Sequence, residues 1–296
     1  MLNRLVVILF KLTARMPFWL IWVLSDIFYV FIFYVARYRR KTVHENLTNS
    51  FPKKSPKEIR VITKKFYHHL SDLGLETIKY SRMTEKEIDS RLKIHNPEIF
   101  EEYYQRHQSV ILVGMHHNNW EWCGSMQRFI KARFLVVYNS VRNNMELERF
   151  ILDNRERFGA KSILVSQSVR TAFQFNNTEQ PGILILAADQ TPQPNAQFWT
   201  TFLNQETAFF TGPMKIATKT NQPVILQHTR KVGRSRYEVF FHKLIENPVE
   251  VKPEEIILAY VKKIEEIIQE EPEYWLWSHR RWKHSRPNNI ELHKRI

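Results

Sequence analysis

The sequence contains one cysteine, Cys123, and only 7 glycines among its 296 residues. A single cysteine excludes an intrachain disulfide and cannot form a cysteine-based metal centre, and it fits a reducing compartment. The few glycines, together with 13% aromatic residues, are not typical of a disordered or low-complexity chain. Internal repeats and flexible linkers are also missing, so we expect one large folded domain with a sizeable core.

The usual signatures of covalent and cofactor-dependent catalysis are missing as well. There is no Gly-x-Ser-x-Gly nucleophile elbow, and nothing near Cys123 indicates an activated thiol. We interpret Cys123 as a small apolar residue on a helix. No metal, flavin or nucleotide motif is visible, so we expect no metal and no cofactor.

One long apolar run lies near the N-terminus, from Pro17 to Ala36. It has about the 20 residues that cross a bilayer, and the basic cluster Arg37 to Lys41 follows at once, as at a membrane surface. Asp26 falls near the middle, where a carboxylate costs about 2.5–3.5 kcal/mol in a membrane-spanning helix. The run therefore predicts a membrane anchor that either spans the bilayer or lies in its interface.

The segment before this run is mostly apolar, with basic residues at helical spacing. Arg4, Lys11 and Arg15 fall on one helical face, which is typical of a helix lying in the membrane interface. A cleaved signal peptide is not expected, because no small-residue cleavage site follows the apolar run. We expect residues 1–41 to form the membrane anchor and residues 42–296 to form a single folded domain.

The formal net charge is +14, from 44 basic and 30 acidic residues. Nucleic acid, an anionic membrane and an acidic protein or substrate would all suit this charge, and charge alone cannot rank them. Near the C-terminus, tryptophans alternate with basic residues: Trp275, Trp277, Arg280, Arg281, Trp282 and Lys283. Such a patch suits lipid headgroups or an acidic carrier protein, whereas the alternative, a base-stacking platform, does not fit a membrane anchor.

The most informative stretch runs from Ser109 to Trp122. An apolar run ends in Gly114, a polar cluster follows, and helix-forming residues resume at Trp120, which predicts a strand, a tight loop and a helix. On one continuous helix His116 and Glu121 would point about 140° apart, but with a loop between them they can meet. A carboxylate beside an imidazole fixes its tautomer and raises its basicity, as a general base requires. We therefore predict that His116 is a base and that Glu121 orients it.

The segment Gly114-Met-His-His-Asn-Asn-Trp-Glu121 resembles the His-x4-Asp/Glu signature of the lysophospholipid acyltransferase superfamily. In particular, it is similar to the Gly-x-His-x-x-Asn-Trp-Glu form of the bacterial lipid A late acyltransferase family. Further segments resemble that family in the same order: Arg39 to Pro52, Ala188-Asp189-Gln190, and Glu271 to Lys283 with Arg286-Pro287. The resemblance covers nearly the whole chain and implies an α/β fold with a central mixed sheet flanked by helices, behind the anchor.

The resemblance also implies an activity and a location. The expected enzyme would move an acyl chain directly from acyl carrier protein to a hydroxyl of a lipid A precursor, on the cytoplasmic face of the inner membrane. An aminolipid, lysophospholipid or glycolipid acceptor is the near alternative, because relatives use the same base on them. A membrane-anchored basic protein without catalysis is the alternative of a different class, and it would tolerate loss of His116 and Glu121.

Further candidate site residues follow from the resemblance and from their positions. A family arginine lies near the end of the helix that Gly159 closes, and Arg155 and Arg157 are both candidates to bind phosphate or an oxyanion, or merely to complement the helix dipole. Asn119 and the loop amides are further oxyanion candidates. Asp189 and Gln190 follow an apolar strand, residues 182–188, and α/β folds bind ligands at such carboxyl ends. A loop-bracing role for them fits equally well, and we expect a packing role for His117.

Overall fold

The structure is a computed structural model that describes residues 2–141 and 144–294, with side chains from residue 6 onward in the first helix. The helices are α1 (Leu2–Thr13), α2 (Phe18–Val30), η1 (Phe31–Val35), α3 (Arg40–Ser50), α4 (Pro56–Tyr80), α5 (Glu85–Asp89), α6 (Ile99–Gln105), η2 (Glu121–Arg128), α7 (Met145–Glu156), η3 (Val165–Gln167), α8 (Ser168–Phe175), α9 (Gly212–Thr220), η4 (Pro248–Glu250), α10 (Pro253–Glu270) and η5 (Pro272–Tyr274). The strands are β1 (Leu92–Ile94), β2 (Val110–Gly114), β3 (Arg133–Tyr138), β4 (Lys161–Leu164), β5 (Gly182–Ala187), β6 (Trp199–Phe202), β7 (Gln205–Ala208), β8 (Val224–Gly233), β9 (Arg236–Ile245) and β10 (Leu292–His293).

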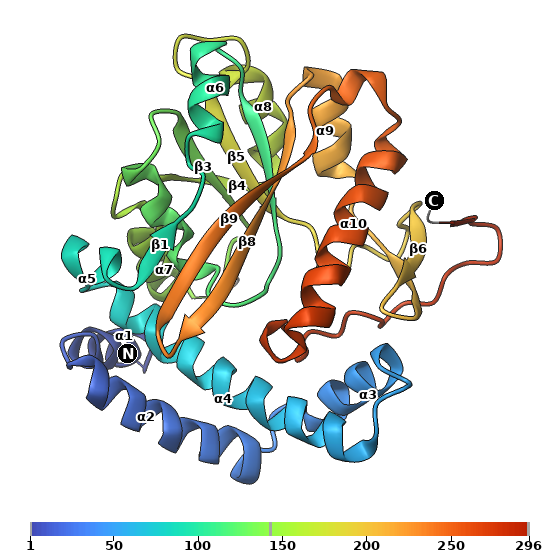
Figure 1. The fold of residues 1–296 in the computed structure, drawn as a ribbon. Coiled ribbons are helices and arrows are strands. Elements are labelled where there is room, and N and C mark those ends of the chain that lie inside the picture. Colours follow the sequence, from blue (N-terminus) through green and yellow to red (C-terminus); the bar gives the residue numbers. More distant parts are fainter. Residues whose placement is uncertain (1, 142–143, 295–296) are drawn as a thin grey trace.

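The core of the fold is a mixed sheet of seven strands in the order β1-β9-β8-β2-β5-β3-β4. Strands β8, β2, β5, β3 and β4 run parallel, while β9 pairs antiparallel with β8 and parallel with β1. Helices cover both faces of this sheet, and β10, β6 and β7 form a small second sheet beyond α10 (Figure 1). This arrangement confirms the predicted α/β class with a central mixed sheet flanked by helices.

The central strand β2 is buried on both faces, which explains its continuous apolar sequence. Ile111 and Val113 pack into the cluster that contains α9 and α10 residues, while Val110 and Leu112 pack into the cluster that contains η2 and α6 residues. Each face of the strand therefore contributes to a separate half of the core. The predicted strand, loop and helix of this stretch are confirmed, with η2 forming a 3-10 helix.

The register between β2 and β5 brings two loops together. The strands are parallel, and Gly114 at the end of β2 pairs with Ala187 at the end of β5. Residues that follow these two positions by equal numbers therefore emerge side by side at the same edge of the sheet. His116 and Asp189 each lie two residues beyond this pair, so the fold places them next to each other.

The N-terminal helices lie against the rest of the chain. Helix α2 runs along α4, as Figure 1 shows, and its Ser25 donates a hydrogen bond of 2.7 Å to Asp72 on α4. Asp26 forms an ion pair with Arg234, which also binds Asp72. The segment Phe18–Val35 is long and apolar enough to cross a membrane, and 28% of it is buried within the protein. The side chain of Arg4, assigned to the predicted interfacial face, lies outside the described residues.

Candidate active site

The centre of the site is a pair formed by His116 and Asp189. Nδ1 of His116 lies 2.7 Å from Oδ1 of Asp189, and the backbone N–H of His116 donates to Oδ2 of the same carboxylate at 2.9 Å. Trp275 donates its indole N–H to that oxygen at 2.8 Å. The Asp189 side chain is 1% exposed, so its charge acts in an environment of low polarity. The ring and the backbone of His116 are thus fixed by one buried carboxylate.

The charges of the pair stabilise each other. Burial opposes the protonated form of His116, but the negative charge and the hydrogen bond of Asp189 outweigh it and raise the pKa of His116. Burial also opposes ionisation of Asp189, yet the charge and hydrogen bonds of His116 and the Trp275 N–H lower the pKa of Asp189 to about 2. Asp189 is therefore ionised at neutral pH, and it favours the tautomer of His116 that carries its proton on Nδ1.

With the proton on Nδ1, the other ring nitrogen of His116 can act as a base. The side-chain amide of Gln190 lies 3.1 Å from Nε2, which makes Gln190 the donor and Nε2 the acceptor in this tautomer. The Trp120 ring stands edge-on to the imidazole, with the ring centres 5.0 Å apart. The His116 side chain is 21% exposed, so Nε2 can be reached from the adjacent cavities.

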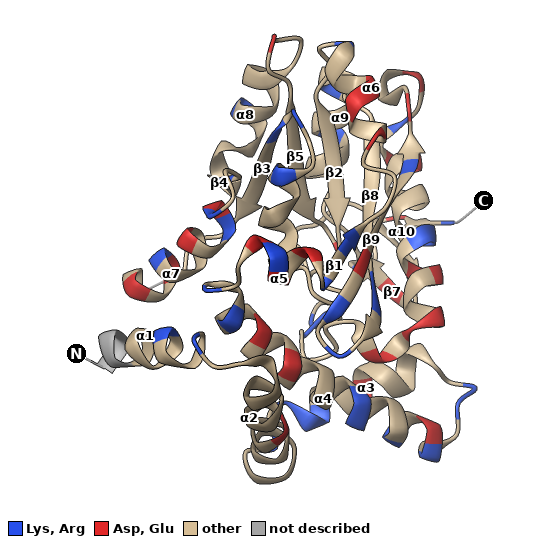
Figure 2. Ribbon diagram, turned by 60° about the vertical axis from the view of Figure 1, so that its left-hand side comes forward, with Lys and Arg blue, Asp and Glu red and all other residues tan. Residues whose placement is uncertain are grey.

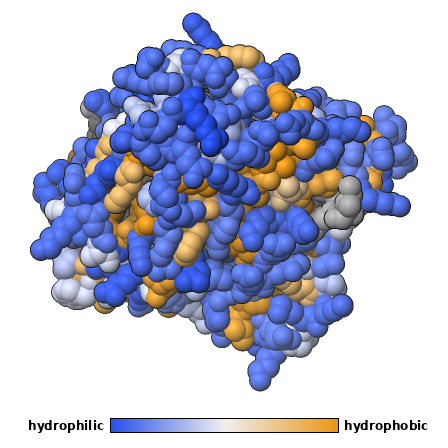
Figure 3. Space-filling model, turned by 45° about the horizontal axis from the view of Figure 1, so that its top comes forward, coloured by the Kyte–Doolittle hydropathy of each residue, from blue (hydrophilic) through white to orange (hydrophobic). Residues whose placement is uncertain are grey.

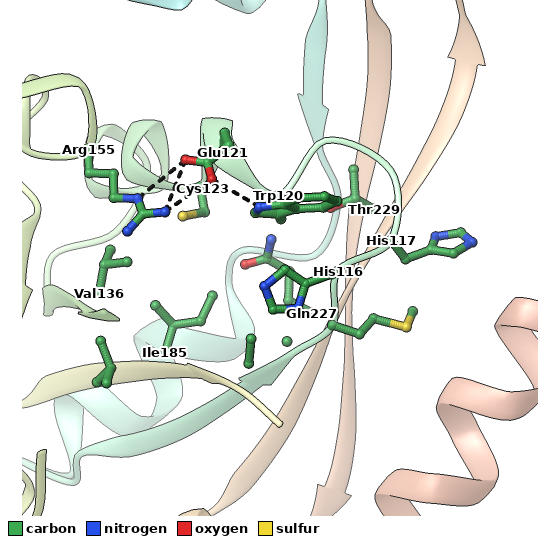
Figure 4. Close-up of a pocket in the computed structure, with 14 residues that line it drawn as sticks. His116, His117, Trp120, Glu121, Cys123, Val136, Arg155, Ile185, Gln227 and Thr229 are labelled. Atoms are coloured by element: carbon green, nitrogen blue, oxygen red, sulfur yellow. Dashed lines mark hydrogen bonds and ion pairs between the residues drawn. The ribbon is translucent and has the colours of Figure 1, made fainter. Parts of the chain in front are cut away.

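Two cavities meet at His116. The smaller has a volume of about 140 Å³ and is lined by apolar side chains such as Val136 and Ile185, with Glu121 and Arg155 at one end (Figure 4). The larger is a groove of about 870 Å³ that shares His116 and Arg155 and is bordered by α8, α9 and the ends of β3 and β5. A base and a cation therefore face a junction of two spaces, as a reaction between two substrates would need.

Glu121 binds Arg155 and makes no hydrogen bond to His116 within the described part of the chain. Nη2 of Arg155 lies 3.1 Å from each carboxylate oxygen of Glu121, and the Trp120 indole donates to Oε1 at 3.0 Å. In Figure 4 Glu121 and Arg155 lie across the cavity from His116, and the Trp120 ring lies beside His116. The prediction that Glu121 orients His116 is therefore wrong, because the sheet register gives that place to Asp189. The charge of Glu121 nevertheless contributes to the raised pKa of His116, after the larger effects of burial and Asp189.

The structure also separates the two candidate arginines. Arg155 lines both cavities, whereas Arg157 donates a hydrogen bond to the backbone carbonyl of Tyr80 and lies against the Phe158 ring. Because the two residues lie two positions apart on α7 and its end, their side chains leave the helix in different directions. Arg155 belongs to the site, and Arg157 binds α4.

Two further predicted roles need correction. Asn119, a candidate for the oxyanion, is 3% exposed and donates its amide to Glu76 at 2.9 Å, so it is not directed at the cavity. Arg281, assigned to a surface patch, is 2% exposed; it donates to the Ala208 carbonyl and lies over the Phe209 ring. The predicted tryptophan patch is largely core as well, because Trp275 and Trp277 are buried and Trp282 is half-buried. Arg280 and Lys283 remain exposed.

The C-terminal segment holds the loop that carries His116, a function that the sequence reasoning missed. The N–H of Asn118 donates to the Tyr274 carbonyl, and the N–H of Leu276 donates to the His116 carbonyl, each at 3.0 Å. Asn118 adopts a left-handed conformation with φ 55°, which asparagine tolerates well. The tryptophans of this segment were the available signal in the sequence. A tryptophan that packs in a core needs a hydrogen-bond partner for its indole N–H, and Trp275 finds that partner in Asp189 beside the loop.

His117 points away from the cavity, in the opposite direction to His116 (Figure 4). Its potential ligand atoms and those of His228 and Glu271 lie within 4.8 Å of one another. However, Nε2 of His117 already contacts the Glu271 carbonyl, and Nδ1 contacts the Asn118 amide. Both ring nitrogens of His117 are thus engaged, and its side chain is buried.

The protein thus has an α/β fold, with a histidine and carboxylate pair at the carboxyl ends of two neighbouring parallel strands. The family model for bacterial lipid A biosynthesis acyltransferases matches residues 1–284. The chain therefore belongs to the bacterial lipid A biosynthesis acyltransferase family, and it is an acyltransferase. A comparison with functionally curated proteins found no match.

Among solved structures, the chain is similar to the 1-acyl-sn-glycerophosphate acyltransferase PlsC from Thermotoga maritima. The two chains are 15% identical, with a TM-score of 0.38, and the alignment covers 84% of this chain and 96% of PlsC.

Proposed function

We propose that this acyltransferase moves an acyl chain from the thioester of acyl carrier protein to a hydroxyl of a lipid A precursor. Nε2 of His116 takes the hydroxyl proton while the oxygen attacks the thioester carbonyl, and the tetrahedral intermediate then expels the thiolate, which receives that proton from His116. The observation that carries this proposal is the buried His116–Asp189 pair, with Nε2 facing the junction of the two cavities. Asp189 stabilises the imidazolium that forms during the reaction.

Arg155 is the proposed stabiliser of the oxyanion. Its Nε and Nη2 atoms hold Glu121, which fixes the guanidinium and leaves the N–H groups of Nη1 for a substrate oxygen. The charge of Glu121 helps to raise the pKa of Arg155 against the effect of its burial, so the group is always cationic. A fixed cation beside the carbonyl would stabilise negative charge as it develops in the transition state.

Direct transfer without an acyl-enzyme fits the chemistry of the one cysteine. Cys123 lines the smaller cavity, but burial raises the pKa of its thiol to about 12. A thiol of that pKa is protonated at neutral pH and is a poor nucleophile. His116 can instead activate the acceptor hydroxyl itself, and no cofactor takes part in this scheme.

The N-terminal helices are the proposed membrane anchor. Trp19, Val23, Ile27, Phe31 and Val35 recur at every fourth position and are between 46% and 67% exposed, so they form one apolar stripe. Helix α2 carries almost no charged residue, whereas the opposite end of the molecule is mainly hydrophilic with separate apolar patches (Figures 2 and 3). A stripe of this kind fits the acyl region of a membrane.

We propose further that the anchor lies in one leaflet of the inner membrane, on its cytoplasmic face. The face of α2 opposite the stripe is bound to the domain through Ser25, Asp26 and Trp22. A membrane-spanning α2 would have to break these bonds and expose Asp26 to lipid, at a cost of about 2.5–3.5 kcal/mol for the carboxylate alone.

The net charge of +14 suits both an acidic carrier protein and a phosphorylated lipid. Arg280 and Lys283 are exposed candidates for the carrier surface.

Mass spectrometry of lipid A tests the proposal. Cells without the gene are complemented with the wild-type chain or with His116→Ala, and their lipid A is compared. Loss of one acyl chain, restored only by the wild type, is the expected result, and the mass difference identifies the chain. Unchanged lipid A with loss of another lipid class would refute the acceptor. Full complementation by His116→Ala would refute the role of His116 and would favour a binding protein without catalysis.

A further inference from the structure

Glu76 is a buried carboxylate on α4 that is 1% exposed and binds the loop carrying His116. The side-chain amide of Asn119 donates to Oε2 of Glu76 at 2.9 Å, and the Tyr237 hydroxyl donates to the same oxygen at 2.7 Å. The hydroxyl of Ser235 donates to Oε1 at 2.7 Å. Helix α4, strand β9, the turn before β9 and the His116 loop therefore meet at one side chain.

The direction of each hydrogen bond at this junction is determined by its donors. Trp22 on α2 donates its indole N–H to the Ser235 oxygen at 2.8 Å, so the Ser235 proton is free to point at Glu76. An indole N–H can only donate, and in the observed arrangement Glu76 accepts from the Asn119 amide and from the hydroxyls of Ser235 and Tyr237. Burial raises the pKa of Glu76, and the hydrogen bonds from the Tyr237 and Ser235 hydroxyls oppose this increase.

Asn119 connects this junction to the catalytic groups. It lies between His116 and Glu121 in the chain, and it is 3% exposed, so its amide has no access to water as a substitute partner. At the other end of this series of hydrogen bonds is Trp22, which lies on α2, the helix that carries the exposed apolar stripe. A continuous path of hydrogen bonds therefore runs from the half-buried Trp22 on α2 through Ser235 and Glu76 to the loop between His116 and Glu121.

We propose that Glu76 is a positioning residue for the reaction, which holds the His116 loop through Asn119 and connects it through Ser235 and Trp22 to the membrane-facing helix α2. Glu76 touches no substrate. It fixes the loop so that His116 and Arg155 keep their relative places across the cavity. This inference rests on the proposed catalytic role of His116.

The chain offers a matched control on the same two helices. Ser25 on α2 donates to Asp72 on α4 at 2.7 Å, and both residues are buried. Asp72 binds Arg234 and Lys231 as well, and it has no hydrogen bond to the His116 loop within the described residues. Ser25→Ala removes the hydrogen bond from α2 to Asp72, and Trp22→Phe removes the hydrogen bond from α2 to the Ser235 hydroxyl. Only Trp22→Phe therefore weakens the path to the loop.

The experiment compares Glu76→Gln, Trp22→Phe and Ser25→Ala in the full-length enzyme in anionic phospholipid vesicles. Acyl-loaded carrier protein and a purified lipid A precursor serve as substrates, and kcat and KM are measured separately. Amide hydrogen exchange of residues 114–121 is followed in the same samples, and His116→Ala serves as the inactive reference. The carboxamide of Glu76→Gln keeps one acceptor oxygen but replaces the other by an N–H donor, so the junction loses one acceptor and its negative charge.

We expect Glu76→Gln to lower kcat at least tenfold with an unchanged KM and to accelerate exchange of the loop amides. Trp22→Phe should lower kcat severalfold, and Ser25→Ala should leave it unchanged. Equal losses for Trp22→Phe and Ser25→Ala, or unchanged kcat and exchange in Glu76→Gln, would overturn the inference. If Glu76→Gln fails to fold, the comparison of Trp22→Phe with Ser25→Ala decides alone. An active His116→Ala would instead overturn the proposed function, while the exchange data would still test the loop.

Discussion

Replacing Asp189 by asparagine removes one charge from the centre of the site and keeps the size of the side chain. The contact of 2.7 Å between Nδ1 and Oδ1 places the charge centres of imidazolium and carboxylate about 4 Å apart. With an effective dielectric constant of about 20, their attraction is about 4 kcal/mol. His116 is positively charged in the transition state and neutral before it, so most of this energy contributes to catalysis. We therefore expect Asp189→Asn to lower kcat about 10³-fold.

The assay measures transfer from acyl carrier protein under saturating conditions, with thermal unfolding as a check on folding. Trp275→Phe is the control, because it removes a neutral donor from the same carboxylate and leaves the charge in place. We expect it to lower kcat about tenfold or less. If Asp189→Asn retains kcat within tenfold of the wild type, or if Trp275→Phe costs as much, the charge of Asp189 does not make His116 a base.

The same substitution has a defined effect on pH dependence. Burial tends to lower the pKa of His116, and Asp189 reverses this, so the wild-type pKa lies above the ordinary value. Activity should rise with pH through that raised pKa, because only neutral His116 can accept a proton. In Asp189→Asn the effect of burial remains without the opposing charge, and the acid limb of the kcat/KM profile should move to lower pH. A limb that stays in place would contradict the assignment of His116.

Other substitutions test the remaining parts of the site. Arg155→Ala should lower kcat about 10²-fold or more, whereas Arg157→Ala should change kcat less than about threefold, since only Arg155 faces the cavity. Cys123→Ala should retain most of the acyltransferase activity, because burial keeps the Cys123 thiol protonated and the thiol does not act as a nucleophile. The lowered pKa of Asp189 stabilises the fold above its ordinary value of 3.8, and about 2 kcal/mol of this should be lost as pH falls toward 2. Urea unfolding of the wild type and Asp189→Asn across that range checks the loss, which the variant should lack.

Local patterns in the sequence were sufficient for much of the fold. The apolar run from Val110 to Val113 and its break at Gly114 predicted a strand and a loop, and β2 and the His116 loop are found there. The strand over residues 182–188 was predicted in the same way, and Asp189 was expected at its carboxyl end. These predictions succeeded because burial on both faces and turn formation depend on neighbouring residues.

The sequence by itself determined the strands before His116 and Asp189, the apolar N-terminal helix and the presence of a histidine and several carboxylates near one edge of a sheet. Only the tertiary structure decided which carboxylate reaches His116. Glu121 is five residues away in the chain, but Asp189, 73 residues away, occupies the position because β2 and β5 pair in register. Packing likewise placed Arg281 in the core, although Arg280 and Lys283 beside it in the sequence are exposed. Such choices depend on the packing of distant segments, whose relative positions no local pattern contains.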